Sequence, residues 1–317
     1  MKRPYFFEIF AVANLILIQI VLWNITRAPM ATLFKMAIVL VPVFLLETLL
    51  GMAIRWAIQR RKYTTIIRSR AWLADTIRLI LFNVVAVQTY GWIKVSVPLL
   101  NKRLYDDELR YLSRVLFLNH SPNVFFLELF SNPSVLRAVD WSYAYVFLAS
   151  INIASIYFLS DPDRSIRIGF MNSNTLMWIV GAWIYLLVPS LGPAYVFPQT
   201  WLPLEPMMTH THQLLRLLMT NYQNVLHGGE VNVFLGIGAF PSLHVAFELL
   251  VWLWLRRVWR PGAMLFAIFT LIIFLGSMIT GWHYLIDAIA GLALAFLAYA
   301  AVAIRRRPTT FSAACLN

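Results

Sequence analysis

Long runs of apolar residues, separated by short polar stretches, dominate the pattern along the chain. A helix that crosses a bilayer with about 30 Å of hydrocarbon needs about 20 mostly apolar residues. The apolar windows predict eight membrane-spanning helices, at 6–24, 31–54, 72–98, 142–160, 172–189, 242–255, 262–280 and 283–304. The third window carries Asp75, Arg78 and Lys94, so a surface helix is its alternative. As a span, it would place Lys94 near one end, with the ammonium group snorkelling outward.

Composition agrees with this pattern. Hydrophobic residues make up 60% of the chain and charged residues 13%, whereas a soluble domain has about a quarter charged. We therefore expect an all-α integral membrane protein. The 26 Lys and Arg residues exceed the 14 acids, but they cluster between the apolar runs, so nucleic acid is not expected as a partner. A single cysteine, Cys315, excludes an intrachain disulfide and a cysteine-based zinc site.

The basic residues also predict the orientation. With both termini in the cytoplasm, the inner segments hold 16 Lys and Arg residues and the outer segments hold 7. We expect a multi-pass protein, in the inner membrane of a bacterium, with four parts. These are N-terminal transmembrane helices (1–98), outer-face interfacial helices (99–141), a catalytic transmembrane core (142–304) and a cytoplasmic tail (305–317).

Two of the predicted outer segments are long. In 99–141, the acidic start at 106–108 is followed by an amphipathic pattern, and Ser121-Pro122 opens a second one, which predicts two helices at the membrane surface. The segment 190–241 is rich in Pro, Gly, His and Asn, and we expect a folded outer cap or loop there.

Three interruptions of the apolar pattern hold polar residues, at 185–195, 238–244 and 276–287. All three fall on the predicted outer side, so they are expected to build one site. His283 and Asp287 are four residues apart; on a continuous helix, the carboxylate would accept the ring N–H and leave the other nitrogen free as a nucleophile. Ser242 is expected to cap the sixth span, and the first-turn N–H groups beside His244 would form an anion site.

The sequence Pro-Ser-x-His at 241–244, followed 39 residues after its histidine by His-x-x-x-Asp at 283–287, resembles the type 2 phosphatidic acid phosphatase superfamily. The resemblance implies a six-helix membrane bundle. It also implies a nucleophilic His283 oriented by Asp287, a proton-donating His244, and a phosphate contact from Ser242.

The chain departs from that family at two motifs. The first family motif, Lys-x6-Arg-Pro, aligns with Tyr185, Gly192 and Pro193, so only the proline matches. Gly276 and Ser277 replace the Ser-Arg pair that opens the third motif. Both changes remove cations that would hold a phosphate, which argues against ordinary phosphatidate hydrolysis.

Other features resemble the inositol phosphorylceramide synthase branch, whose members move a phospho-alcohol head group between lipids. These features are the Pro-Ser-x-His motif, the His-Tyr-x-x-Asp motif with the Ala-x-Ala-Gly that follows it (283–291), and the stretch 137–143. The resemblance covers about residues 100–304.

We therefore expect a lipid phosphotransferase that works from the outer leaflet through a phosphohistidine on His283. Tyr185, Gly192, Pro193 and Ser242 would lie on the substrate side. The donor would be a phospholipid and the acceptor a lipid alcohol or water, and neither metal nor cofactor is required.

Alternatives remain open. They are a lipid phosphate phosphatase, a polyprenyl-phosphate-dependent glycosyltransferase that uses Asp106 and Asp107, and a transporter or lipid-binding protein with Glu47 and Asp75 as intramembrane charges. His210, His212 and His227 are either loop residues or contacts to a metal or head group.

Overall fold

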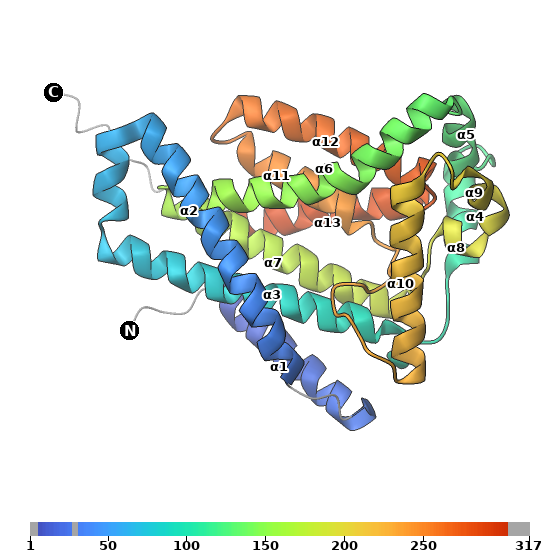
Figure 1. Ribbon diagram of the computed structural model, residues 1–317, viewed down its shortest axis with the longest axis horizontal. Coiled ribbons are helices and arrows are strands. Elements are labelled where there is room, and N and C mark those ends of the chain that lie inside the picture. Colours follow the sequence, from blue (N-terminus) through green and yellow to red (C-terminus); the bar gives the residue numbers. More distant parts are fainter. Residues whose placement is uncertain (1–5, 27–30, 304–317) are drawn as a thin grey trace.

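The computed structural model describes residues 6–26 and 31–303, and every regular element within these ranges is helical. The longer helices of the bundle are α1 (Phe6–Thr26), α2 (Ala31–Ile67), α3 (Arg70–Leu100), α6 (Pro133–Leu159), α7 (Arg164–Leu187), α11 (Leu243–Leu255), α12 (Arg260–Ile279) and α13 (Leu285–Ala303). The remaining helices are α4 (Asp106–Leu116), α5 (Pro122–Leu129), α8 (Pro193–Val196), α9 (Pro198–Trp201), the 3-10 helix η1 (Leu202–Leu204) and α10 (Thr209–His227). Helices α4, α5, α8, α9 and α10 gather at one end of the bundle (Figure 1).

Six described helices are long and apolar enough to cross a membrane, namely α1, α2, α3, α6, α12 and α13. The prediction of a helical multi-pass membrane protein is therefore confirmed. The windows at 172–189 and 242–255 fall in α7 and α11. Helix α11 has 13 residues, a length of about 20 Å, which is shorter than the hydrocarbon core. The count of eight spans stays a prediction.

Two helices begin well before their apolar windows. Helix α6 starts at Pro133, where the Asn132 side chain accepts the Ser134 N–H at 2.9 Å. Helix α7 starts at Arg164, where Asp163 caps the Ser165 N–H at 2.7 Å. Hydropathy detects only the apolar part of a helix, whereas the caps set its true start. The last residues of the predicted interfacial part, 99–141, therefore belong to α6. The predicted tail, 305–317, lies outside the described residues.

The end that carries the short helices matches the sequence prediction in part. Helices α4 and α5 are two short helices within 99–141, and their expected place at the membrane surface stays a prediction. The segment 190–241, expected as a cap or loop, contains the 19-residue helix α10, which the apolar pattern did not predict. This helix ends at Gly228, whose φ of 75° is a left-handed conformation that glycine adopts without strain.

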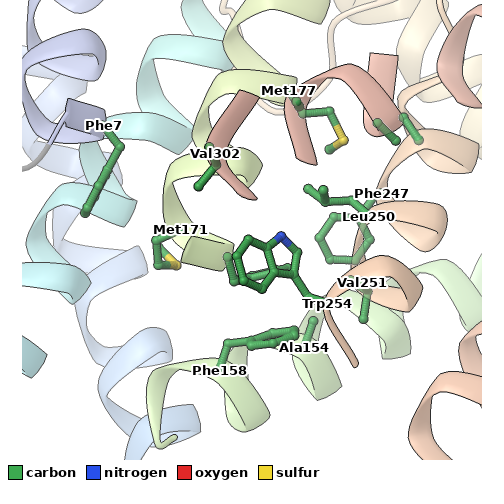
Figure 2. Close-up of a cluster of buried hydrophobic side chains, with 14 of the residues drawn as sticks. Phe7, Ala154, Phe158, Met171, Met177, Phe247, Leu250, Val251, Trp254 and Val302 are labelled. Carbon is green, nitrogen blue, oxygen red and sulfur yellow. The ribbon is translucent and has the colours of Figure 1, made fainter. Parts of the chain in front are cut away.

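The core of the bundle is packed around Trp254 of α11 (Figure 2). Its indole N–H donates to the Ser173 hydroxyl of α7 at 2.8 Å. Gly169 makes this packing possible, because a Cβ there would lie 2.2 Å from the Trp254 ring. Phe158 of α6 and Val302 of α13 belong to the same buried cluster (Figure 2). The core thus holds α6, α7, α11 and α13 together, and these helices carry the site at their other ends.

Ion pairs occupy the end of the bundle away from the short helices. Arg55 of α2 pairs with Asp161 at 2.8 Å, and Asp75 of α3 pairs with Arg164 at 2.7 Å. Glu8 of α1 pairs with Arg78 of α3. Asp75, which a transporter would use as a mobile charge, is therefore bound within the helix packing.

Candidate active site

The three polar segments singled out in the sequence meet at the end of the bundle that carries the short helices. The Ala239 N–H donates to the Ser190 carbonyl at 3.1 Å, and the Ala194 N–H donates to the Gly281 carbonyl at 2.7 Å. The Ser242 N–H donates to the Asp287 carbonyl at 2.9 Å. The structure therefore brings 185–195, 238–244 and 276–287 together, as their predicted location on one side required.

Two histidines face each other in this cluster. His283 Nδ1 lies 2.8 Å from the Ala239 carbonyl oxygen, and His283 Nε2 lies 3.3 Å from His244 Nδ1. A carbonyl oxygen only accepts, so Nδ1 of His283 carries the proton and its neutral ring has a lone pair on Nε2. That lone pair in turn requires His244 Nδ1 to be the donor. The arrangement gives one unprotonated nitrogen and one N–H, which face each other.

Aromatic rings surround His244. Its ring centroid lies 4.2 Å from that of Phe147, 5.7 Å from that of Tyr143 and 6.0 Å from that of Trp282. Within the described part of the chain, His283 is the one hydrogen-bond partner of the His244 ring. His283, by contrast, is buried and anchored through Ala239. His244 is therefore held by ring contacts and one hydrogen bond to His283, whereas His283 is also fixed by a backbone carbonyl.

Asp287 does not make the hydrogen bond that the four-residue spacing predicted. Its Oδ2 lies 3.6 Å from His283 Nδ1, and it accepts the Tyr284 N–H at 2.8 Å. The reason is that α13 begins at Leu285, so His283 precedes the helix instead of lying on its first turn. The Ala239 carbonyl takes the expected place of the carboxylate, while Asp287 remains an adjacent buried charge.

Ser242 is the N-cap of α11, as expected, and its hydroxyl accepts the Val245 N–H at 3.5 Å. The residue is fully buried. Helix α13 approaches it closely at Gly291, where a Cβ would lie 2.2 Å from the Ser242 carbonyl oxygen. The close approach of the two helices fixes the start of α11 and therefore the position of His244. A contact between Ser242 and phosphate stays a prediction.

Asp106 connects the first and third polar segments, which the sequence did not reveal. Its carboxylate accepts the backbone N–H groups of Leu191 and Gly192 at 3.0 and 2.9 Å, and the Tyr284 hydroxyl at 3.1 Å. Burial raises the pKa of this carboxyl, and the two backbone N–H groups act in the opposite direction. Gly192 has a φ of 100°, and a Cβ there would lie 2.5 Å from the Trp282 carbonyl oxygen.

These contacts show what Gly192 and Pro193 do in the structure. The Gly192 N–H is bound to Asp106, and Pro193 begins α8 beside the backbone of Gly281. Both residues shape the loop that packs on His283. The Gly192 N–H is therefore not free to donate to a substrate, and the predicted contact of Gly192 and Pro193 with substrate stays a prediction.

Two further residues from α4 and α5 hold the segment around His283. Ser113 accepts the Ile286 N–H at 3.1 Å. The Asn123 side-chain amide donates to the carbonyls of Met278 and His283 at 3.0 and 2.9 Å. The sequence signal was weak: Asp106 and Ser113 lie seven residues apart on one face of α4, where the surrounding pattern suggested a plain surface helix.

Tyr185 of α7 is buried against the second polar segment, because a Cβ at Gly238 would lie 2.8 Å from its ring. Its side chain also lies beside the backbone N–H of Leu243. Lys94 Nζ lies 5.4 Å from the Tyr185 ring centroid. The sequence predicted a snorkelling Lys94; instead the side chain points into the packed structure, because aromatic rings receive its ammonium group there.

The three histidines of the segment 190–241 that the sequence singled out have protein partners. His210 Nδ1 lies 2.8 Å from Asp140 Oδ2, His212 contacts the carbonyls of Met208 and Trp201, and His227 contacts the Gln223 carbonyl. Among the residues that the structure describes, no group of three or more potential metal ligands is found. Asp140 also accepts the backbone N–H groups of His210 and Thr211, so it joins α6 to the start of α10.

Comparison with known proteins agrees with this geometry. A family model described as the PAP2 superfamily matches residues 107–301, which is more than half of the chain. No curated protein and no solved structure matched. The matched region contains all three polar segments, and α1, α2 and α3 precede it.

Proposed function

Because the chain belongs to the PAP2 superfamily, whose members are phosphatases or phosphotransferases, we propose that it is a membrane phosphotransferase that moves a phospho-alcohol head group from a phospholipid to a lipid alcohol. Membership of this superfamily supports a lipid enzyme of the phosphatase or phosphotransferase type. The choice of transfer over hydrolysis is our proposal.

The facing pair His244 and His283 carries this proposal. His283 Nε2 attacks phosphorus, so that an N–P bond forms and the bond from phosphorus to the lipid oxygen breaks. His244 acts as an imidazolium, with a proton on each ring nitrogen: its Nδ1 proton goes to that leaving oxygen and a neutral ring remains. In the second step the acceptor hydroxyl gives its proton to His244, its oxygen bonds to phosphorus, and the N–P bond breaks.

Substrate binding must first separate the two rings. A phosphorus atom does not fit between nitrogens that are 3.3 Å apart. His283 is anchored to Ala239, whereas His244 is held by ring contacts with Phe147, Tyr143 and Trp282. We therefore assign the movement to His244, which turns its N–H from His283 to the leaving oxygen.

The start of α11 supports the developing negative charge. The N–H groups of the first helical turn point toward the N-terminus, where the helix dipole favours an anion. Tyr185 lies beside the Leu243 N–H and Ser242 caps this turn. The side chains of Tyr185 and Ser242 therefore supply polar contacts to the phosphate oxygens at the start of α11.

We further propose that the site faces the outer side and that both termini are cytoplasmic, as the basic residues indicate. Helix α11 is about 10 Å shorter than the hydrocarbon core. Its N-terminal end, where His244 lies, would then be somewhat below the outer boundary, within reach of a lipid phosphate.

The contacts of Asp106 weigh against the glycosyltransferase alternative. Three donors already occupy its carboxylate, which leaves it structural. Replacing Asp106 would therefore disturb the site under either hypothesis, so Asp107, which is exposed, is the residue that separates them. Asp107→Ala is expected to retain transfer and would abolish a glycosyltransferase that depends on this acid.

The test uses the purified full chain, labelled phospholipids of several head groups, and either ceramide or diacylglycerol as acceptor. We expect head-group transfer and an acid-labile, base-stable phosphoprotein that His283→Ala does not form. His244→Ala should form the phosphoprotein from a donor whose leaving group is a nitrophenolate, because that group leaves without protonation. Transfer by the His283→Ala variant within about tenfold of wild type, a difference of roughly 1.4 kcal/mol, would contradict the mechanism.

A further inference from the structure

The cations of the first family motif have no counterpart at the aligned positions, where Tyr185 and Gly192 stand. A phosphate group taken out of water needs a compensating positive charge or several strong donors. The structure shows a lysine that reaches the same place from another helix. It is Lys94 of α3, which precedes the family-matched region and packs against α7.

Lys94 is half-buried, with its ammonium group between two tyrosines. Nζ lies 5.6 Å from the ring centroid of Tyr90 and 5.4 Å from that of Tyr185. The aliphatic stem is covered by the loop that leads to α11, because a Cβ at Gly236 would lie 2.9 Å from Lys94 Cγ. Among the described residues, no carboxylate pairs with this ammonium group.

An ammonium group without a carboxylate partner is unfavourable in a helix that crosses a membrane, and such groups commonly serve function. The two tyrosine rings compensate part of the desolvation through cation–π attraction, but they do not neutralise the charge. The ammonium group lies against Tyr185, whose ring packs on Gly238 in the segment that leads to His244. It therefore brings a positive charge to the side of the site formed by Tyr185 and the second polar segment, where no carboxylate of the described residues pairs with it.

We propose that Lys94 binds a phosphate oxygen of the lipid substrate and takes the place of the missing first-motif cation. This inference rests on the proposed function, because it concerns the same site. The ligand is an anionic phosphate ester, whose negative charge would pair with the Lys94 ammonium group. One lysine in place of a Lys-Arg pair also suits a singly charged phosphodiester better than a doubly charged phosphomonoester.

The test compares Lys94→Met, which keeps the stem and removes the charge, with Lys94→Arg, which keeps the charge. Lys102→Met, at an exposed position, is the matched control. Two quantities are measured on the full chain in detergent: the Kd of inorganic phosphate, and the KM of the phospholipid donor. We expect Lys94→Met to raise both at least about tenfold, Lys94→Arg to stay within about threefold of wild type, and the control to be unchanged.

Thermal stability separates binding from packing. Because Lys94 is an uncompensated charge, Lys94→Met should have a Tm equal to or above that of wild type. The inference is overturned if Lys94→Met binds phosphate as wild type does, if wild type binds none, or if both Lys94 variants lose binding together with a lower Tm.

The inference and the proposed function fail in different ways. Phosphate binding that depends on Lys94, in a protein that forms no phosphohistidine, would retain the anion site and reject the transferase. A phosphohistidine formed by Lys94→Met with the wild-type KM would retain the transferase and reject the role of Lys94.

Discussion

The Asp106 carboxylate accepts a hydrogen bond from the Tyr284 hydroxyl at 3.1 Å, across 178 positions of the sequence. Tyr284 directly follows His283, and the same carboxylate holds the backbone of Leu191 and Gly192. One side chain of α4 thus joins the loop after α7 to the loop before α13. The positions of the two histidines therefore depend on α4, a helix that carries no catalytic group of its own.

Asp106→Ala is expected to lower both stability and activity. The change leaves two backbone N–H groups and one hydroxyl without their partner, and each unsatisfied buried group costs about 1–3 kcal/mol. Asp107→Ala, at the exposed neighbouring position, is the control and should be near neutral. Thermal unfolding in detergent measures both variants. Equal Tm values for the two would show that Asp106 does not hold the loops.

Asp287→Asn is expected to slow turnover less than His283→Ala does. The Ala239 carbonyl already fixes the His283 tautomer at 2.8 Å, so the amide removes only the nearby negative charge that favours a positive ring. We expect a loss of about 10–100-fold for Asp287→Asn and at least about 10³-fold for His283→Ala. Single-turnover kinetics of phosphohistidine formation give the comparison. Equal losses would mean that the carboxylate, and not Ala239, orients the ring.

The sequence predicted the parts of the site that depend on local pattern. The apolar windows located the helices, and the motifs identified Ser242, His244 and His283 as neighbours. Asp287 lies beside His283, but without the expected hydrogen bond, because the spacing argument assumed a helix that starts before His283, whereas α13 starts at Leu285.

The remaining features depend on contacts between distant segments. Nothing near Asp106 in the sequence indicates Tyr284, and a lysine inside an apolar window looks the same whether it snorkels or turns inward. The apolar pattern did not predict helix α10, because some of the residues on its inner face are polar; Asn221, for example, is buried and donates to the carbonyls of Asn232 and Leu235 at 2.9 Å. Periodicity does not encode such pairings.

The outer surface of α4 supports its expected place at the membrane interface. Leu109 and Ser113 face inward, whereas Leu112 and Leu116 are about half exposed. In a chain whose native cysteine is replaced (Cys315→Ser), spin labels at Leu112→Cys and Leu116→Cys should collide more with oxygen than with a polar nickel complex. Asp107→Cys, on the polar face of the same helix, should show the opposite preference. If the spin labels at all three positions collide more with the nickel complex than with oxygen, α4 does not lie at the membrane interface.

The topology prediction uses the same cysteine-free background, because Cys315 is the single native cysteine. His120 and Val258 are exposed at opposite ends of the bundle. An impermeant maleimide should label His120→Cys in intact cells and Val258→Cys only after the membrane is permeabilised, as the excess of 16 over 7 basic residues requires. The reversed labelling pattern would place the histidine pair on the cytoplasmic face.

The last prediction concerns the class of donor. Tyr185, Gly192, Gly276 and Ser277 stand where the family has its phosphate-binding motif residues, so the site has lost cations that a phosphomonoester, with a charge of about −1.5 to −2, requires. A phosphodiester carries a single negative charge, which the Lys94 ammonium group balances alone. We therefore expect head-group transfer from a diester lipid to exceed the release of inorganic phosphate from phosphatidate when both are offered at equal concentration. The measurement is the ratio of the two products, with His283→Ala as the blank for each. Dominant release of inorganic phosphate would place the enzyme among the lipid phosphatases, with water as the group that attacks the phosphohistidine.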